Sequence, residues 1–164
     1  MIVLGIDPGL KHTGWGVIEQ RGSTLRCLAY GCITTQTGRP DAERLAEIHA
    51  GITAVIERFE PSETAIESVY FSNNAKTAFA TGQARGVAIL AAAAMPVGEY
   101  GPGEIKLAVV GAGDASKHQV QYMVRAILGL PREPEPHHAA DALAAAICHA
   151  NCRVVRAAGR GGLQ

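Results

Sequence analysis

The run Met1-Ile-Val-Leu-Gly-Ile-Asp7-Pro-Gly9 decides the fold. An uninterrupted apolar segment of this kind is typical of a strand that is buried on both faces of a sheet. It stops at the carboxylate of Asp7, and Pro8-Gly9 then turns the chain. Asp7 is either an ordinary turn former or a functional group held at a strand end. A second acid in the same context favours a functional role, since the apolar residues 64–66 lead directly to Glu67.

Length and composition indicate one α/β domain. The chain has 164 residues, of which 48% are hydrophobic and 5% are aromatic, and a chain of this length buries roughly two thirds of its unfolded surface. We expect a single domain over 1–152 and a flexible basic tail over 153–164. Lys plus Arg number 15, as do Asp plus Glu. The net charge therefore neither favours nor excludes a nucleic-acid partner.

Signals for export or for membrane insertion are missing from the sequence. No basic run precedes the first apolar segment, so we expect no signal peptide. The most apolar stretch, residues 86–95, is too short to span a bilayer. The cysteines lack the spacing of a zinc site or of a disulfide framework, and the pair Cys148 and Cys152 is better explained as small buried residues than as metal ligands. We predict a cytoplasmic protein.

Periodicity and turn residues predict the order of the elements. Two β-rich segments, 13–19 and 25–34, are separated by a turn of hairpin length. A helix begins at Pro40-Asp41 and ends before Pro61, because its apolar positions recur at helical spacing. A long helix capped by Asn73-Asn74 ends at about Met95. The remaining predicted elements are a strand that ends at Glu67, a short strand over 97–100, and helices over 103–110, 116–128 and 137–152.

This order predicts an α/β fold with a five-stranded mixed sheet, in which three antiparallel strands are joined by two parallel ones and helices flank the sheet. The first strand is expected to be central, with the strand of Glu67 beside it in parallel. Asp7 and Glu67 then become neighbours. They lie at the carboxyl ends of parallel strands, where open α/β sheets bind ligands.

The predicted pair of acids needs a charge to balance it. Two adjacent carboxylates repel each other, and a shared proton or a divalent cation relieves the repulsion. The last predicted helix offers His138 and Asp141, which lie three residues apart and so share a face. Asp141 also fits an ordinary acid in the first turn of a helix, but the rest of that helix is almost wholly apolar. We therefore expect a site for Mg²⁺ or Mn²⁺, with two ions suited to phosphoryl transfer on a phosphodiester.

The chain resembles the RuvC family, bacterial Holliday-junction resolvases with an RNase H-like fold, over nearly its whole length. The motifs that carry the resemblance are Gly5-Ile-Asp7-Pro-Gly9, Thr13-Gly-Trp-Gly16, Ile66-Glu67 with Tyr70, Gly82-Gln-Ala-Arg-Gly86, Val109-Val-Gly111, Lys117 with Val120-Gln121, and Ala139-Ala-Asp141-Ala-Leu143. The resemblance implies a metal-dependent endonuclease. Such an enzyme resolves four-way DNA junctions by paired symmetric nicks during recombination and DNA repair, using a metal-activated water.

The resemblance also assigns roles to single residues. Asp7, Glu67 and Asp141 match acidic metal ligands, and His138 occupies a fourth position where some members have Asp. An imidazole suits Mn²⁺ better than Mg²⁺, so Mn²⁺ is the expected preference.

Five further residues are implied to contact DNA. Lys106 and Lys117 match basic residues near the scissile phosphate and the DNA backbone, and Arg85 adds to this positive surface. On sequence alone, a solvated helix face is the favoured interpretation of each lysine, and the resemblance changes this interpretation to a DNA contact for Lys106 and Lys117. Tyr70 matches an aromatic residue that stacks on an unpaired base, and Phe71 beside it is the fifth expected contact. Tyr70 also fits half-buried packing against Phe71.

The partners implied by the resemblance are four-way junction DNA, a second copy of the chain, and the branch-migration proteins RuvA and RuvB. Two symmetric cuts require two sites, which a C₂ homodimer supplies. The helix over 74–95 is the candidate interface, although it also fits an internal packing helix. Two other functions remain open: a junction-binding protein in which His138 has abolished cleavage, and a nucleotide-binding ATPase of the actin-like superfamily, for which the chain is short.

Overall fold

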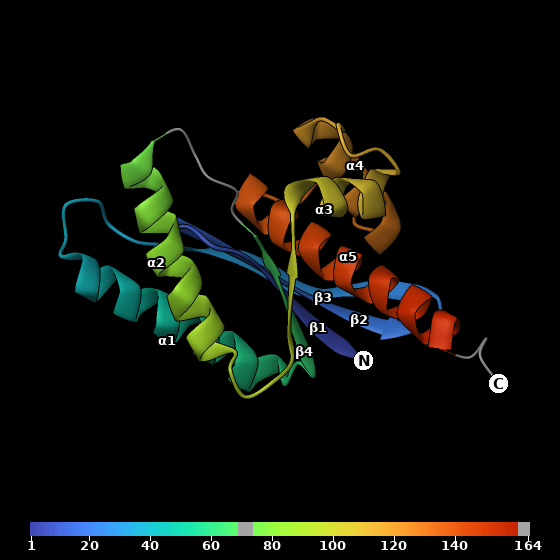
Figure 1. Ribbon diagram of the computed structural model, residues 1–164, viewed down its shortest axis with the longest axis horizontal. Coiled ribbons are helices and arrows are strands. Elements are labelled where there is room, and N and C mark those ends of the chain that lie inside the picture. Colours follow the sequence, from blue (N-terminus) through green and yellow to red (C-terminus); the bar gives the residue numbers. More distant parts are fainter. Residues whose placement is uncertain (69–73, 161–164) are drawn as a thin grey trace.

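The computed structural model describes residues 1–68 and 74–160, with residues 153–160 described by their backbone alone. Within these residues the sheet has five strands in the order β3-β2-β1-β4-β5 (Figure 1). They are β1 (Ile2–Asp7), β2 (His12–Arg21), β3 (Thr24–Thr34), β4 (Glu63–Glu67) and β5 (Val97–Tyr100). β1 pairs with β2 antiparallel and with β4 parallel. The predicted mixed sheet with a central first strand is confirmed.

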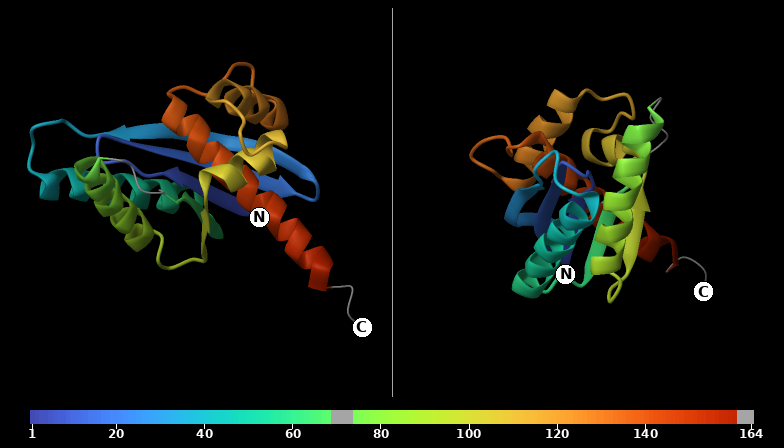
Figure 2. Two further views of the ribbon diagram at one scale, coloured as in Figure 1. Left: turned by 45° about the horizontal axis from the view of Figure 1, so that its top comes forward. Right: turned by 90° about the vertical axis from the view of Figure 1, so that its left-hand side faces the viewer.

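Helices cover both faces of this sheet. They are α1 (Asp41–Phe59), α2 (Ala75–Ala91), α3 (Pro102–Val110), α4 (Lys117–Leu128) and α5 (His137–Arg160). α1 and α2 lie against one face, and α3, α4 and α5 lie against the other (Figure 2). The layers are therefore helix, sheet and helix, with α5 crossing the sheet obliquely (Figure 1).

Alternation along the strands divides the apolar residues between two cores. On β1, Val3 belongs to the core under α5, whereas Leu4 and Ile6 belong to the core under α1 and α2. On β4, Ala65 faces α5 and Ile66 faces the other side. Because successive side chains point to opposite faces, Asp7 and Glu67 fall on the α5 side. The pleat thus decides which helices can complete a site with them.

Two helix boundaries differ from the sequence prediction. Asn74 caps α2 as expected, accepting hydrogen bonds from the backbone N–H groups of Lys76 and Thr77. However, α2 ends at Ala91, and residues 92–95 form turns ahead of Pro96, which disfavours helix in the residue before it. α5 continues to Arg160 instead of ending at Cys152, since neither Pro nor Gly interrupts it before Gly159. The looseness of the basic tail stays a prediction.

α5 rests directly on strand backbone at two glycines. A Cβ on Gly5 of β1 would lie 1.9 Å from the carbonyl oxygen of Ala142, and a Cβ on Gly14 of β2 would lie 1.9 Å from that of His138. Any side chain there would push the helix away. These glycines therefore set how closely the first turns of α5 approach the ends of β1 and β2.

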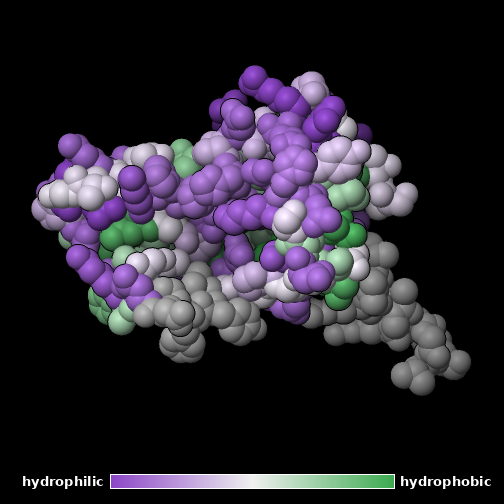
Figure 3. All heavy atoms as spheres, turned by 90° about the horizontal axis from the view of Figure 1, so that it is seen from above, coloured by the Kyte–Doolittle hydropathy of each residue, from purple (hydrophilic) through white to green (hydrophobic). Residues whose placement is uncertain are grey.

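The described surface is mostly hydrophilic when seen from above, and its apolar side chains form small patches (Figure 3). In the described residues, no helix combines the length and the apolar character that a membrane crossing requires.

Candidate active site

Two parallel strands deliver carboxylates to one edge of the sheet. Ile6 of β1 is in register with Ile66 of β4, so Asp7 and Glu67 are the next residues on each strand. Both strands are buried up to these acids, because Leu4, Ile6 and Ile66 have no exposed surface. The backbone register therefore places Asp7 and Glu67 side by side at the strand ends, as predicted.

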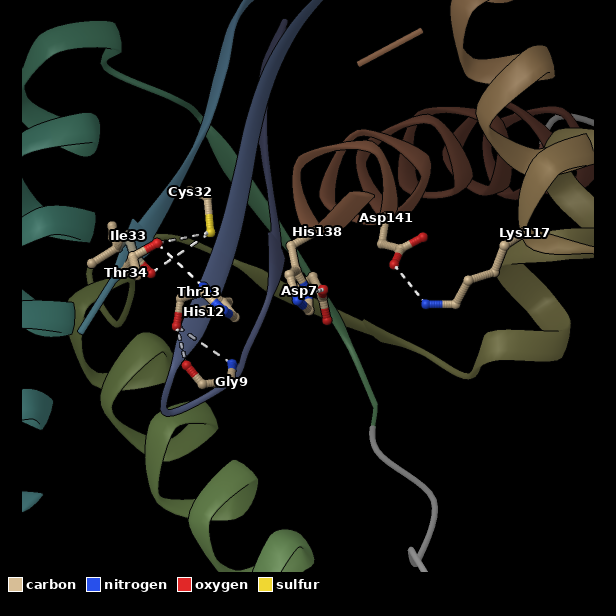
Figure 4. A network of polar contacts seen from close by, with 10 residues as sticks. All are labelled: Asp7, Gly9, His12, Thr13, Cys32, Ile33, Thr34, Lys117, His138 and Asp141. Carbon is tan, nitrogen blue, oxygen red and sulfur yellow. Dashed lines mark hydrogen bonds and ion pairs between the residues drawn. The ribbon is translucent and has the colours of Figure 1, made fainter. Parts of the chain in front are cut away.

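The first turns of α5 bring two further side chains to this edge. The Nδ1 atom of His138 lies 2.7 Å from Oδ2 of Asp7, across 131 residues of sequence. A carboxylate oxygen accepts hydrogen bonds, so Nδ1 is the donor. Asp141, one turn later, lies 3.7 Å from Nζ of Lys117 at the start of α4. Figure 4 shows His138 pointing toward Asp7 and Asp141 pointing toward Lys117.

Three of these side chains are close enough to share one ion. Asp7, His138 and Asp141 each offer a ligand atom, and the three atoms lie within 4.8 Å of one another. Glu67 lines the same cleft, which has a volume of about 420 Å³. The structure thus brings all four predicted ligands to one cleft, although Glu67 stands outside the tightest group.

Burial and mutual repulsion perturb the acids of the cleft. Burial, followed by the charges of Asp7 and Asp141, raises the pKa of Glu67 to about 8, against a smaller opposing effect of Lys117. Burial and then Asp7 also raise the pKa of Asp141, while Lys117 and the two histidines lower it. At both acids, burial and mutual repulsion outweigh the positive charge of Lys117, which favours the protonated carboxyl groups.

The hydrogen bond to Asp7 is the main cause of the raised pKa of His138, and burial opposes it. When both of its ring nitrogens carry protons, His138 is positively charged, and it then supplies positive charge beside Asp7. A divalent cation would supply more, and three carboxylates with one imidazole are a donor set that fits Mn²⁺ or Mg²⁺. The residues present fit a metal centre.

The sequence-predicted DNA contacts divide into three groups. Lys106 and Lys117 line the metal cleft, which favours their predicted role. Arg85 forms an ion pair with Glu99 and does not belong to the described lining of the cleft, so its predicted contact with DNA stays a prediction. Tyr70 and Phe71 lie outside the described residues.

A second cavity of about 590 Å³ adjoins the metal cleft and shares His138 and Thr81 with it. Its lining includes Lys11, His12 and Lys76, which the sequence analysis did not single out. A signal was available: residues 10–12 complete the turn that follows Asp7, so they must lie beside it. Lys76 carried no comparable signal, because the approach of α2 to this turn is a tertiary contact.

Local contacts fix that turn and the histidines around it. The hydroxyl of Thr13 donates to the carbonyl of Gly9 at 2.7 Å. The ring of His12 stacks on that of His138 with centroids 5.4 Å apart. The centroid of the His137 ring lies 4.1 Å from that of the His138 ring. His138 is therefore held by rings as well as by Asp7.

Comparison with known proteins agrees with this geometry. The family model described as "Crossover junction endodeoxyribonuclease RuvC" matches residues 3–149. A protein of that name from Moorella thermoacetica is 52% identical over 153 residues, which cover 92% of each chain.

Solved structures show the same relationship. RuvC of Thermus thermophilus in complex with a Holliday junction substrate superposes with a TM-score of 0.91 at 41% identity, covering 95% of this chain and 96% of that one. The yeast mitochondrial Holliday junction resolvase Ydc2 superposes with a TM-score of 0.67 at 13% identity, over 98% of this chain and 86% of that one. The second likeness establishes the fold only. The chain therefore belongs to the RuvC family of crossover junction endodeoxyribonucleases.

Proposed function

We propose that this protein resolves four-way DNA junctions by metal-dependent hydrolysis of one phosphodiester bond per active site. The observation that carries the proposal is the convergence of Asp7, His138 and Asp141 within 4.8 Å, beside Glu67, in a cleft that two lysines line. Its family membership gives the substrate class, since the Thermus relative binds a Holliday junction. The actin-like ATPase alternative is set aside on the same family match.

Each group of residues has a separate task in this reaction. Asp7, Glu67, Asp141 and His138 would hold one or two divalent cations. Such a cation would lower the pKa of a bound water and would balance the negative charge that develops in the reaction. Lys106 and Lys117 face the same cleft and balance the negative charge of the phosphate. Without a cation, Lys117 pairs with Asp141, and His138 pairs with Asp7.

The second cavity extends the surface on which a strand can lie. Lys11 and Lys76 line it, and its one acid among the described lining residues, Asp41, already pairs with Arg44. A phosphate backbone that leaves the metal cleft past His138 would meet this basic wall. We therefore include Lys11 and Lys76 with Lys106 and Lys117 as contacts to DNA phosphates.

We further propose a homodimer that uses the outer face of α2. Ala84 and Ala88 are buried toward the protein, whereas Phe79 and Leu90 are 70% and 66% exposed. Gly82 lies in the same outer stripe, and a Cβ there would meet nothing within 4 Å. An uncovered apolar stripe with small residues in its middle allows a second helix to approach closely. Two copies related by C₂ symmetry would place two clefts on one junction.

Two assignments rest on the resemblance to the family alone. These are an interaction with RuvA and RuvB at the junction and localisation in the cytoplasm.

A nicking assay tests the function directly. Synthetic four-way junctions and matched duplex DNA would be incubated with Mn²⁺, Mg²⁺ or a chelator, using the wild type and Asp7→Asn. We expect the wild type to cut the junction with metal and not the duplex, and Asp7→Asn to bind the junction without cutting it. A wild type that binds junctions but cuts none with either metal would establish the non-catalytic alternative instead.

A further inference from the structure

A buried polar network lies on α5 away from the metal cleft. His149 Nε2 lies 2.6 Å from Oε2 of Glu63, and His149 Nδ1 lies 2.9 Å from the hydroxyl of Tyr100. His149 is 7% exposed and Tyr100 is 6% exposed. These residues come from β4, β5 and α5, and neither described cavity next to the active site includes them.

Both the neutral and the protonated ring of His149 satisfy the two hydrogen bonds. The carboxylate of Glu63 accepts, so Nε2 of His149 carries a proton and donates it. Nδ1 accepts from the hydroxyl of Tyr100 if the ring is neutral, and donates to it if the ring is protonated. Buried polar groups joined in this way are costly to separate, because a broken bond leaves an unpaired group away from water. The network therefore holds its three elements in one arrangement.

Tyr100 connects this network to Glu67. It is in register with Glu67 across β4 and β5, and its carbonyl accepts a hydrogen bond of 2.8 Å from the N–H of Ser68. Its side chain, meanwhile, contacts His149 on α5. One residue thus contacts both the strand end that presents Glu67 and the helix that presents His138 and Asp141.

The packing of α5 explains why such an anchor is needed. From residue 139 to 150 its buried side chains are largely alanine, and an alanine surface has shallow ridges that define axial position weakly. The glycine contacts at Gly5 and Gly14 limit how closely the helix approaches. A slide along the axis would be opposed by the hydrogen bonds of His149, about three turns beyond His138.

The network lies at a similar distance from the ligands along β4 and along α5. β4 rises about 13 Å from Glu63 to Glu67 at 3.3 Å per residue. α5 rises about 16 Å from His138 to His149 at 1.5 Å per residue, and it crosses the sheet obliquely (Figure 1). Glu63 and Glu67 share the α5 face of β4, so one end of the strand fixes the helix and the other end offers the ligand.

We propose that Glu63, Tyr100 and His149 form a positioning network that sets the axial register of α5 and thereby the spacing of His138 and Asp141 from Asp7 and Glu67. This inference rests on the proposed metal-dependent function. The three residues are not among those that line the metal cleft, so the network acts through the helix that carries two of the ligands.

The test compares metal binding with stability in variants of the full chain. Mn²⁺ affinity would be measured by calorimetry without DNA, and kcat and KM would be measured on a four-way junction. We expect Tyr100→Phe and Glu63→Leu to weaken Mn²⁺ binding by about fivefold to tenfold and to lower kcat with KM unchanged. Glu63→Gln keeps an acceptor for Nε2, and it should stay within about twofold of the wild type.

A matched control separates positioning from general stability. Ile52 of α1 is fully buried in the other core, and Ile52→Val should lower the melting temperature while leaving Mn²⁺ affinity unchanged. Wild-type Mn²⁺ affinity and kcat in folded Tyr100→Phe would overturn the proposal. Should Glu63→Leu fail to fold, Tyr100→Phe still decides, because it removes one hydroxyl only. A wild type that cuts no DNA would refute the function, while Mn²⁺ affinity would still report on the register.

Discussion

His138 is the residue at which this site differs from an all-carboxylate metal centre. Its Nδ1 atom donates to Asp7 over 2.7 Å, and this hydrogen bond is the main reason that its pKa is raised. A histidine binds metal only through a ring nitrogen that carries no proton, so a protonated imidazolium must first lose one proton. Binding through Nδ1 would replace the contact with Asp7, whereas binding through Nε2 would keep it. In both cases the affinity of the metal depends on the pH.

Replacing His138 should change which metal supports cleavage. We expect wild-type activity to be higher with Mn²⁺ than with Mg²⁺, and we expect His138→Asp to reduce that ratio by about tenfold, because a carboxylate suits Mg²⁺ as well as Mn²⁺. The measurement is the initial rate of junction cleavage with each metal at saturation. Equal ratios in wild type and variant would show that His138 does not bind the ion.

Lowering the pH should favour the proton on His138 over the ion. The raised pKa means that the folded, metal-free protein keeps this proton to a higher pH than an exposed histidine does. Mn²⁺ affinity should therefore rise with pH through the titration of His138. Calorimetric titrations from about pH 5.5 to about pH 8.5 cover the usual pKa of histidine. They should show that Mn²⁺ affinity depends less on pH in His138→Asp than in the wild type. An identical dependence in both would assign the titration to another group.

Glu67 should make the metal-free protein less stable as pH rises. Its pKa is about 8 in the fold against 4.5 ordinarily, so the folded state binds the extra proton between these values. Its stabilising contribution is complete below pH 4.5 and is lost as the pH rises through 8. We expect Glu67→Gln to raise the melting temperature with chelator by about 5 °C at pH 8.5 and to leave it unchanged near pH 4.

The exposed acid Glu57 of α1 offers a control for that experiment. Glu57→Gln should leave the melting temperature unchanged at both pH values. Added Mn²⁺ should stabilise the wild type more than Glu67→Gln at pH 8.5, since the positive ion relieves the repulsion between ionised Glu67 and the other acids. If Glu67→Gln were no more stable than the wild type at pH 8.5, ionisation of Glu67 would not lower the free energy of unfolding.

Among the elements, α5 decides whether the acids of the sheet become a site. It supplies His138 and Asp141, and its backbone lies against Gly14 and Gly5. Its N-terminal turn is also the part nearest to Asp7. A small displacement of this helix would separate ligands without exposing a core residue, so activity should respond more strongly than stability.

Gly14→Ala is the substitution that displaces α5 most directly. The new Cβ would lie 1.9 Å from the carbonyl oxygen of His138, and a backbone atom cannot swing aside as a flexible side chain does. We expect a loss of about 100-fold in kcat and a decrease of a few degrees in melting temperature. In Gly103→Ala, where a Cβ meets nothing within 4 Å, both quantities should be nearly unchanged. Wild-type kcat in Gly14→Ala would show that the helix adjusts without moving its ligands.

Several elements and two ligand pairs were predictable from local sequence. The apolar run before Asp7 predicts the buried strand β1, and the spacing of His138 and Asp141 predicts their common face. Other features had no local signal. Glu63, Tyr100 and His149 are far apart in sequence, and each fits an ordinary strand or helix position alone. Likewise, the pairing of Arg85 with Glu99 joins α2 to β5, which composition does not reveal.

For the whole molecule, the unpaired face of α2 is the feature that one copy leaves unexplained. Phe79 and Leu90 are large, apolar and mostly exposed on the same side of the helix. Exposed apolar residues scattered singly are common, but here they share a stripe with Gly82 and Gly86. A second copy would cover the stripe and bring a second cleft to the junction.

Phe79→Glu should therefore yield monomers. Sedimentation should show half the wild-type mass at concentrations where the wild type is dimeric, because a carboxylate would be buried without a partner. On a supercoiled cruciform plasmid, the variant should produce nicked circles instead of linear product. Leu107→Glu serves as the control, since Leu107 of α3 is 59% exposed outside α2. A dimeric Phe79→Glu would place the interface elsewhere.

The distance of 131 residues between Asp7 and His138 also matters during biosynthesis. The ribosome makes Asp7 and Glu67 before it makes α5. A growing or interrupted chain can carry both strand acids, yet without α5 it lacks the other ligands. Chains released before α5 is made would then add no nuclease to the cell, because α5 carries two of the four ligands.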